Sequence, residues 1–161
     1  LSSILSGLVA TAVMVLFLYL PLSWGGVYYD TLGAIGSVFL KRVDAQSRLL
    51  GAFLLMVGGV LFAFFYGAFT LMFMYGSFAV PNYSILESPT NINLFYPLLG
   101  IVGGLAQGMY ITLITTFIIT DFHPVESYRQ AYPLILSFLI GHVGYGAVVM
   151  FFQQQLLHLL L

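Results

Sequence analysis

The sequence predicts an all-α integral membrane bundle of four transmembrane helices, with short loops and one interfacial amphipathic segment, in a single domain (1–161). Apolar residues make up 61% of the chain and charged residues 6%, too few for the surface of a soluble domain. The 17 glycines lie mainly in apolar stretches, as is typical of membrane helices. Four stretches without Asp, Glu, Lys or Arg are each long enough for the ~20 residues that span a bilayer. These are 1–29, 49–86, 88–120 and 130–161.

The first predicted helix covers about 3–20 and ends before Pro21, because proline disfavours helix in the residue that precedes it. A short helix is predicted at 31–40, on the membrane surface. Its apolar residues recur at helical spacing, and Asp30 is its expected N-cap. The polar segment 41–48 follows as a loop.

The second helix is predicted at about 49–75 and the third at about 94–120, where Pro97 is tolerable in the first turn. The connection 80–93 is rich in turn-forming residues, and Glu87 is its only charged residue. We therefore expect an irregular loop between these two helices.

The fourth helix is predicted at about 131–152, again with a proline, Pro133, near its start. Three glutamines at 153–155 are expected to mark the membrane interface. The apolar residues 156–161 are then expected to lie along the membrane or against a partner.

All four basic residues fall in two of the predicted loops, 21–48 and 121–130. Cytoplasmic loops of membrane proteins carry an excess of Lys and Arg. These loops are therefore predicted to be cytoplasmic, and both termini and Glu87 to be extracytoplasmic. The predicted location is the bacterial plasma membrane or an equivalent energy-transducing membrane.

Composition also excludes several functions. A net charge of -1 provides no basic patch, so no nucleic-acid partner is predicted. The absence of cysteine excludes disulfides and thiolate metal sites. No nucleophile–base pair, phosphate loop or dinucleotide motif occurs, so no enzyme activity is predicted. No Asp, Glu or Lys lies within a predicted helix, which argues against an ion-coupled pump.

Asp121, His123 and Glu126 have a spacing that resembles a metal site. Their segment contains Pro124 and has no fourth ligand nearby, so no metal is predicted. The segment is interpreted as a solvated loop that caps the fourth helix, with Arg129 paired to Glu126 or to lipid phosphate.

Small residues recur every fourth position on every predicted helix, and this spacing places them on one face. Two interpretations stay open. The strips pack the four helices within the chain, or one strip takes another protein, a lipid, a quinone or a flat pigment. The strips are Ser3, Gly7 and Thr11; Gly59, Ala63 and Gly67; Gly100, Gly104 and Gly108; and Ser137 and Gly141.

His142 is the only histidine inside a predicted span, and an ionisable residue there is a functional hypothesis by default. Flanking glycines leave room for a macrocycle, so the ring could contact a haem or chlorophyll; Gln107 and Tyr145 complete the candidate ligand-binding residues. The alternative is a hydrogen bond to a neighbouring helix, with Gln107, Tyr110 or Thr112 as partner. One histidine alone excludes a bis-histidine haem. Bound lipids are expected, and no other cofactor is predicted.

Two segments resemble a group of small uncharacterised bacterial four-helix membrane proteins. They are 7–14, with the sequence GLVATAVM, and 141–146, with the sequence GHVGYG. The resemblance implies a four-helix membrane fold and no particular activity. The group often has another histidine in its second helix, where this chain has Met56, Val57 and Gly58. That departure argues against a shared ligand role for the histidines.

The function expected from these features is that of a non-catalytic accessory or structural subunit of a multi-subunit membrane complex, in respiratory or photosynthetic electron transport. Its expected partners are other integral membrane subunits and lipids. An alternative is a protein that binds haem, chlorophyll, quinone or lipid through His142 or the strip of Gly100, Gly104 and Gly108. A third is a small oligomeric transporter with a pore built from Gln107 and the threonines of the third helix.

Overall fold

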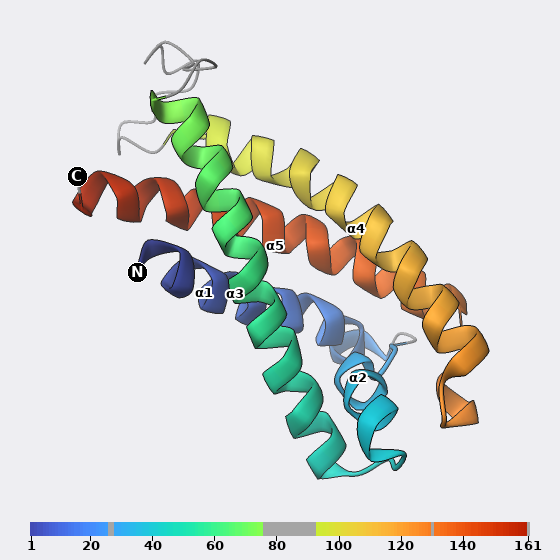
Figure 1. Ribbon diagram of the computed structural model, residues 1–161. Helices are drawn as coiled ribbons and strands as arrows, with labels where there is room; N and C mark the ends of the chain where they lie inside the picture. The colour runs from blue at the N-terminus through green and yellow to red at the C-terminus, as the bar shows by residue number, and fades with distance from the viewer. Residues whose placement is uncertain (26–27, 76–92, 130, 161) are drawn as a thin grey trace.

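The computed structural model describes residues 1–25, 28–75, 93–129 and 131–160. Every element in these ranges is helical (Figure 1). The predicted loop around Glu87 lies outside the described residues. The elements are α1 (Ser2–Tyr19), the 3-10 helix η1 (Leu20–Trp24), α2 (Thr31–Leu40), α3 (Ala45–Tyr75), α4 (Phe95–Phe122), the 3-10 helix η2 (Glu126–Tyr128) and α5 (Ala131–Leu160).

Four segments of these helices are long and apolar enough to cross a membrane, which confirms the all-α prediction with four such helices. By length and composition they are Ser2–Ser23, Ala45–Tyr75, Phe95–Phe122 and Ile135–Leu157.

Two helix boundaries differ from the prediction by more than two residues. Helix α3 begins at Ala45 rather than 49, because Asp44 and Ser47 cap it reciprocally. The Ser47 N–H donates to Asp44 Oδ1 at 2.9 Å, and the Asp44 N–H donates to Ser47 Oγ at 3.1 Å. Helix α5 continues past 152 to Leu160. The glutamine segment was expected at the interface, but Gln153 is fully buried and its Nε2 donates to the carbonyl of Ala63 at 2.9 Å.

Helices α1 and α3 contact each other through their strips of small residues. A Cβ atom added to Gly7 would lie 2.9 Å from Ala63 Cβ, so the two backbones leave no space for a larger side chain. The strips match pair by pair in antiparallel order: Ser3 faces Gly67, Gly7 faces Ala63, and Thr11 faces Gly59.

Helix α5 covers the glycine strip of α4. A Cβ atom on Gly100 would collide with the carbonyl of Gly146, and one on Gly104 with the carbonyl of His142. A Cβ atom on Gly108 would lie 3.0 Å from His142 Cβ. This strip, a candidate site for a quinone or lipid in the sequence, is therefore filled by α5 and has no room for a ligand.

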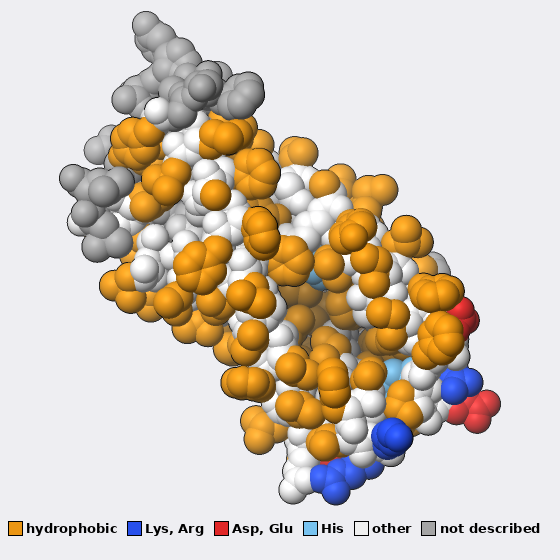
Figure 2. Space-filling model, in the orientation of Figure 1, with side chains coloured by type: hydrophobic (Ala, Val, Ile, Leu, Met, Phe, Trp, Pro, Cys, Tyr) orange, Lys and Arg blue, Asp and Glu red, His pale blue; other side chains and the backbone are white. Residues whose placement is uncertain are grey.

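Helices α3 and α4 diverge, with α5 and α1 behind them (Figure 1). Long side chains bridge the two helices. The rings of Phe73 and Phe95 are 5.9 Å apart, and the Tyr66 hydroxyl donates to Gln107 Oε1 at 2.9 Å. The space-filling view shows a hollow on this face of the molecule (Figure 2).

Helix α2 has the predicted bounds, and Asp30 caps it as predicted by accepting from the Gly33 N–H at 3.1 Å. Its small residues, however, turn inward. Gly36 and Ser37 are buried, and a Cβ atom on Gly36 would collide with the carbonyl of Ser47 in α3. Phe39 is 64% exposed. Close backbone contact with α3, rather than burial of an apolar face, therefore orients α2.

Candidate ligand-binding site

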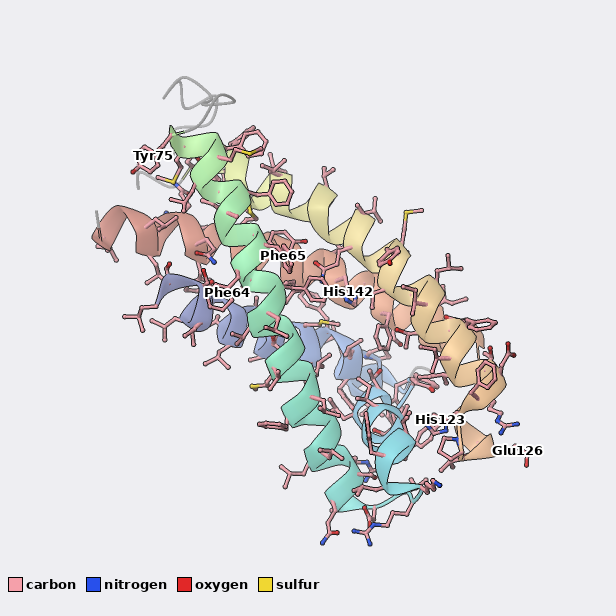
Figure 3. The ribbon with its side chains drawn as sticks, viewed as in Figure 1. Phe64, Phe65, Tyr75, His123, Glu126 and His142 are labelled. Carbon is pink, nitrogen blue, oxygen red and sulfur yellow. The ribbon has the colours of Figure 1, made fainter. Side chains whose placement is uncertain are left out.

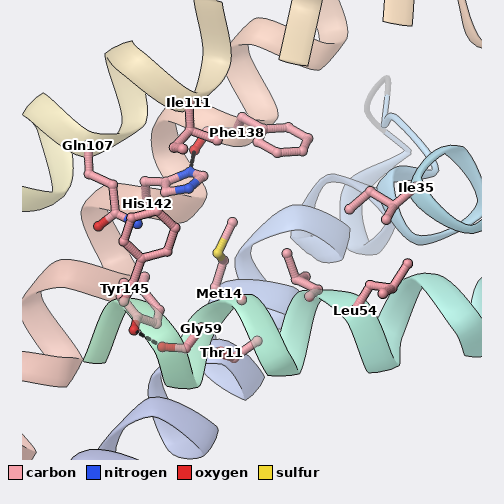
Figure 4. A pocket seen from close by; sticks show the side chains of 13 residues that line it. Thr11, Met14, Ile35, Leu54, Gly59, Gln107, Ile111, Phe138, His142 and Tyr145 are labelled. Atoms are coloured by element: carbon pink, nitrogen blue, oxygen red, sulfur yellow. Dashed lines mark hydrogen bonds between the residues drawn. The ribbon is translucent and has the colours of Figure 1, made fainter. Parts of the chain in front are cut away.

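A cavity of about 150 Å³ lies among the helices beside His142 (Figure 4). Residues from five helices line it, including Thr11 and Met14 of α1, Ile35 of α2 and Gln107 of α4. The remaining lining residues are Leu54, Leu55, Gly58, Gly59, Phe62, Ile111, Phe138, His142 and Tyr145. Most of this wall is apolar, so its few polar atoms determine what the cavity could bind.

The His142 side chain is 95% buried, since its relative exposure is 5%, and one ring nitrogen is already used. Nδ1 lies 2.7 Å from the carbonyl oxygen of Phe138, one turn earlier in α5. A carbonyl only accepts, so Nδ1 carries the proton and Nε2 of the neutral ring is a bare acceptor. Nε2 has no hydrogen-bond partner among the described residues. The imidazole is one of the side chains that line the cavity (Figure 4).

The hydroxyl groups in the cavity wall already donate their hydrogens to backbone carbonyl groups. Tyr145 donates to the carbonyl of Gly59, and Thr11 donates to the carbonyl of Gly7 at 2.7 Å. Gln107 Oε1 accepts from Tyr66 of α3. The amide nitrogen of Gln107 has no partner among the described residues. The cavity thus offers a ligand the acceptor His142 Nε2 and the donor amide of Gln107, while the hydroxyl oxygens of Thr11 and Tyr145 keep lone pairs that could also accept.

A larger apolar cleft of about 570 Å³, the α3–α4 cleft, lies between these two helices and shares Phe62 and Gln107 with the first cavity. Figure 3 shows His142 between α3 and α4, and Phe65 on α3. The α3–α4 cleft is lined by Phe62, Phe65, Tyr66, Phe69, Phe73, Leu99, Val102, Gly103, Ala106, Gln107, Tyr110 and Met150.

The residues around His142 do not fit a haem or chlorophyll. The glycines that were expected to leave room for a macrocycle face α1 side chains. A Cβ atom on Gly141 would lie 3.1 Å from Leu18 Cδ2, and one on Gly144 would lie 2.8 Å from the ring of Phe17. The remaining space beside the imidazole is the small cavity, which is too small for a tetrapyrrole.

The predicted partners of His142 are also wrong, because its hydrogen bond stays within α5. Tyr110 is 66% exposed, and the buried Thr112 hydroxyl has no partner among the described residues. Gln107 bonds instead to Tyr66, a residue that the sequence analysis did not single out. Nothing in the sequence distinguishes Tyr66 from the other tyrosines, because its role depends on how α3 and α4 diverge.

A second polar cluster is centred on Asp30, between the first two spans, at the end of the molecule where the basic side chains gather (Figure 2). Asp30 accepts hydrogen bonds from Tyr19 Oη at 2.9 Å and from Arg48 Nε at 2.9 Å. It also accepts from Tyr128 Oη at 3.1 Å. With the Gly33 cap, one carboxylate connects α1, α2, α3 and η2.

Two opposing effects act on the pKa of Asp30. Burial raises the pKa, but hydrogen bonds to the carboxylate, led by that from Arg48, outweigh burial and hold the pKa below its ordinary value of 3.8. Burial, together with the nearby Asp30 charge, raises the pKa of Tyr128 to about 12. This cluster therefore keeps an ionised carboxylate and a neutral phenol side by side at neutral pH.

The loop that was expected to be solvated holds a buried histidine. His123 is 1% exposed, its Nε2 lies 2.9 Å from the carbonyl of Ala34 in α2, and its Nδ1 accepts from the Val125 N–H at 3.0 Å. Asp121 and Glu126 are exposed, and Glu126 lies at the outer edge of the molecule (Figure 3). Among the described residues, no three metal-ligating side chains come together.

Arg129 does not pair with Glu126 as expected. Its Nε and one terminal nitrogen donate to the carbonyl oxygen of His123, at 3.0 and 2.8 Å. The guanidinium therefore closes the turn after α4 and helps to hold His123 against α2.

Fold and cavity together define the class: an all-helical protein with four helices long enough to cross a membrane, and a small cavity that holds one free imidazole nitrogen. No protein-family model matches the chain, and comparisons with curated proteins and with solved structures find no match. The candidate ligand-binding site is therefore the main basis for the function proposed below.

Proposed function

We propose that this chain is an integral membrane protein that binds a lipophilic ligand, with the ligand's polar head in the cavity at His142 and its apolar tail in the α3–α4 cleft. The observation that supports this most directly is the buried imidazole of His142 in the cavity wall, whose Nδ1 is bonded to Phe138 while Nε2 has no partner among the described residues. A donor of the ligand could bond to this nitrogen, and a hydrogen bond is electrostatically stronger in such an apolar surrounding than in water.

The α3–α4 cleft supports the lipophilic part of the proposal. Its wall is aromatic and aliphatic, and Tyr66 and Gln107, two of its polar side chains, are already bonded to each other. Ligand sites are commonly apolar concavities with a few placed polar groups. The proposed role is binding without chemistry, because the described residues near His142 contain no nucleophile–base pair.

The proposal is tested by filling the α3–α4 cleft. Ala106 lines it, whereas Leu105, the preceding residue on α4, is not part of its wall. Wild type, Ala106→Phe and Leu105→Phe would be purified in mild detergent, and the organic-soluble compounds that co-purify would be quantified by mass spectrometry. We expect one lipophilic compound near one per chain in wild type and Leu105→Phe, and its loss in Ala106→Phe.

Equal amounts of every compound in the three proteins would contradict the proposal, because lipids that merely surround the helices do not depend on the α3–α4 cleft. Both variants introduce the same ring on adjacent exposed positions of one helix. A loss in Ala106→Phe alone therefore reports on the cleft rather than on helix stability.

We also propose that the end of the molecule with the basic residues faces the cytoplasm. We further propose that the chain works as an accessory subunit within a larger electron-transport complex. Large apolar side chains such as Leu113, 72% exposed, and Leu16, 69% exposed, support a surface covered by lipid or by neighbouring subunits. Gentle solubilisation, a native gel and an absorption spectrum of the same band would test the accessory role. Migration of the protein on the gel without other subunits would contradict that role.

A further inference from the structure

We infer that the ligand's head is a hydroquinone, a single aromatic ring with hydroxyl groups, and that the site prefers this reduced form over the quinone. This inference rests on the proposed function and specifies the class of ligand. It follows from three properties of the site: the size of the cavity, the donor or acceptor character of its free hydrogen-bonding groups, and the adjacent α3–α4 cleft, which shares two lining residues with the cavity.

The size of the cavity selects one ring. Its volume is about 150 Å³. An engineered apolar cavity of about this volume in another protein holds a single benzene molecule. Aromatic side chains are already part of the wall, and the rings of Phe138 and His142 are stacked with centroids 5.8 Å apart. A planar six-membered ring therefore matches the cavity, whereas a tetrapyrrole does not.

The hydrogen-bonding groups select the oxidation state. Nδ1–H of His142 donates its hydrogen bond to the carbonyl of Phe138, so the bare Nε2 can only accept and requires a donor from the ligand. A hydroquinone hydroxyl is such a donor. A quinone carbonyl has only lone pairs and would set an oxygen against the Nε2 lone pair. The Gln107 amide can donate to an oxygen of either form, so it contributes binding without discriminating between them.

The tail follows from the geometry of the two cavities. Phe62 and Gln107 line both, so a ring beside His142 has the α3–α4 cleft as its neighbour. The cleft volume of about 570 Å³ and its aromatic wall suit a prenyl or alkyl chain. A free phenol without a tail would leave this apolar surface uncovered and would bind more weakly.

The test compares a decyl-substituted benzoquinol with the matching benzoquinone, at a fixed detergent concentration, by equilibrium dialysis against the purified protein. We expect wild type to bind the quinol about tenfold more tightly, the effect of one hydrogen bond that the quinone cannot make. His142→Leu should lower quinol binding to the level of the quinone. His142→Gln offers both a carbonyl and an amide, so it should bind both forms with similar affinity.

Equal affinity of wild type for the two forms, or tighter binding of the quinone, would overturn the inference without relying on any variant. So would quinol binding that is unchanged in His142→Leu. If Ala106→Phe still abolishes the binding of both forms, the proposed function stands and only the choice of head fails. If wild type binds neither form, the hydroquinone is excluded, and the co-purification experiment decides the proposed function separately.

Discussion

At the residue scale, the position of His142 depends on glycines in a different helix. Gly104 lies against the carbonyl of His142, and Gly108 lies against its Cβ atom. Side chains at these positions would push α5 away and move the imidazole from the cavity. The glycine strip, which the sequence suggested as a binding groove, therefore places the candidate ligand-binding side chain instead of binding a ligand itself.

This contact predicts opposite effects for one substitution at two positions. In Gly104→Ala the new methyl group collides with the carbonyl of His142, so we expect a loss of about 1–3 kcal/mol in the free energy of unfolding. In Gly58→Ala the methyl group meets no atom within 4 Å, and the higher helix propensity of alanine should stabilise α3 by up to about 1 kcal/mol. Thermal unfolding in detergent, followed by circular dichroism, measures both.

Equal destabilisation by the two changes would show that helix α4 does not approach α5 as closely as described. Because Gly58 and Gly104 both lie well inside long helices, the pair isolates the helix–helix contact from the general effect of removing a glycine.

At the scale of elements, Asp30 acts as the junction of α1, α2, α3 and η2. Its carboxylate has a lowered pKa, so folding stability gained from the charge is present above the unfolded pKa of about 4 and is lost as pH falls through the lower folded value.

Asp30→Asn tests this junction. Asparagine still caps α2 but cannot carry the charge that pairs with Arg48. We expect the variant to be less stable than wild type at pH 7, and the difference to shrink below about pH 4 as the wild-type carboxylate is protonated. Unfolding midpoints of the two proteins from pH 7 down to pH 3 measure it. A difference that stays constant over this range would refute the role of the charge.

The elements also show what the sequence could predict. Length and the absence of charge predicted the four long helices, and the Asp30 cap and helical spacing predicted α2. The early start of α3 was missed because its first turn is polar, although Asp44 and Ser47 form a cap that could have indicated it. The extension of α5 was missed because Gln153 was read as an interfacial residue, whereas it bonds within the bundle.

The candidate site was predicted only in part. His142 and Gln107 were singled out because polar residues are rare in apolar helices, and both line the cavity. The α3–α4 cleft could not be predicted, since it follows from the divergence of two helices whose sequences are similarly apolar. The availability of Nε2 could not be predicted either, because it depends on the bond from Nδ1 to Phe138.

At the scale of the whole molecule, the positions of the basic residues suggest how the protein is oriented in a membrane. The basic side chains gather at one end, whereas the N-terminal residue Leu1 lies elsewhere and is 78% exposed (Figures 1 and 2). The chain has no cysteine, so single cysteines can be introduced without a background. Val43→Cys and Glu126→Cys should react with a membrane-impermeant maleimide only from the cytoplasmic side, and Leu1→Cys only from the other side. Labelling of Val43→Cys from outside intact cells would reverse the proposed orientation.

The divergence of α3 and α4 determines how the affinity for the proposed ligand should be expressed. The α3–α4 cleft lies on the side of the bundle rather than at its end, so in a bilayer it would open toward the acyl chains (Figure 2). A ligand would then enter by lateral diffusion within the membrane. Occupancy would follow the mole fraction of ligand among the lipids, and diluting the membranes with buffer would not empty the site.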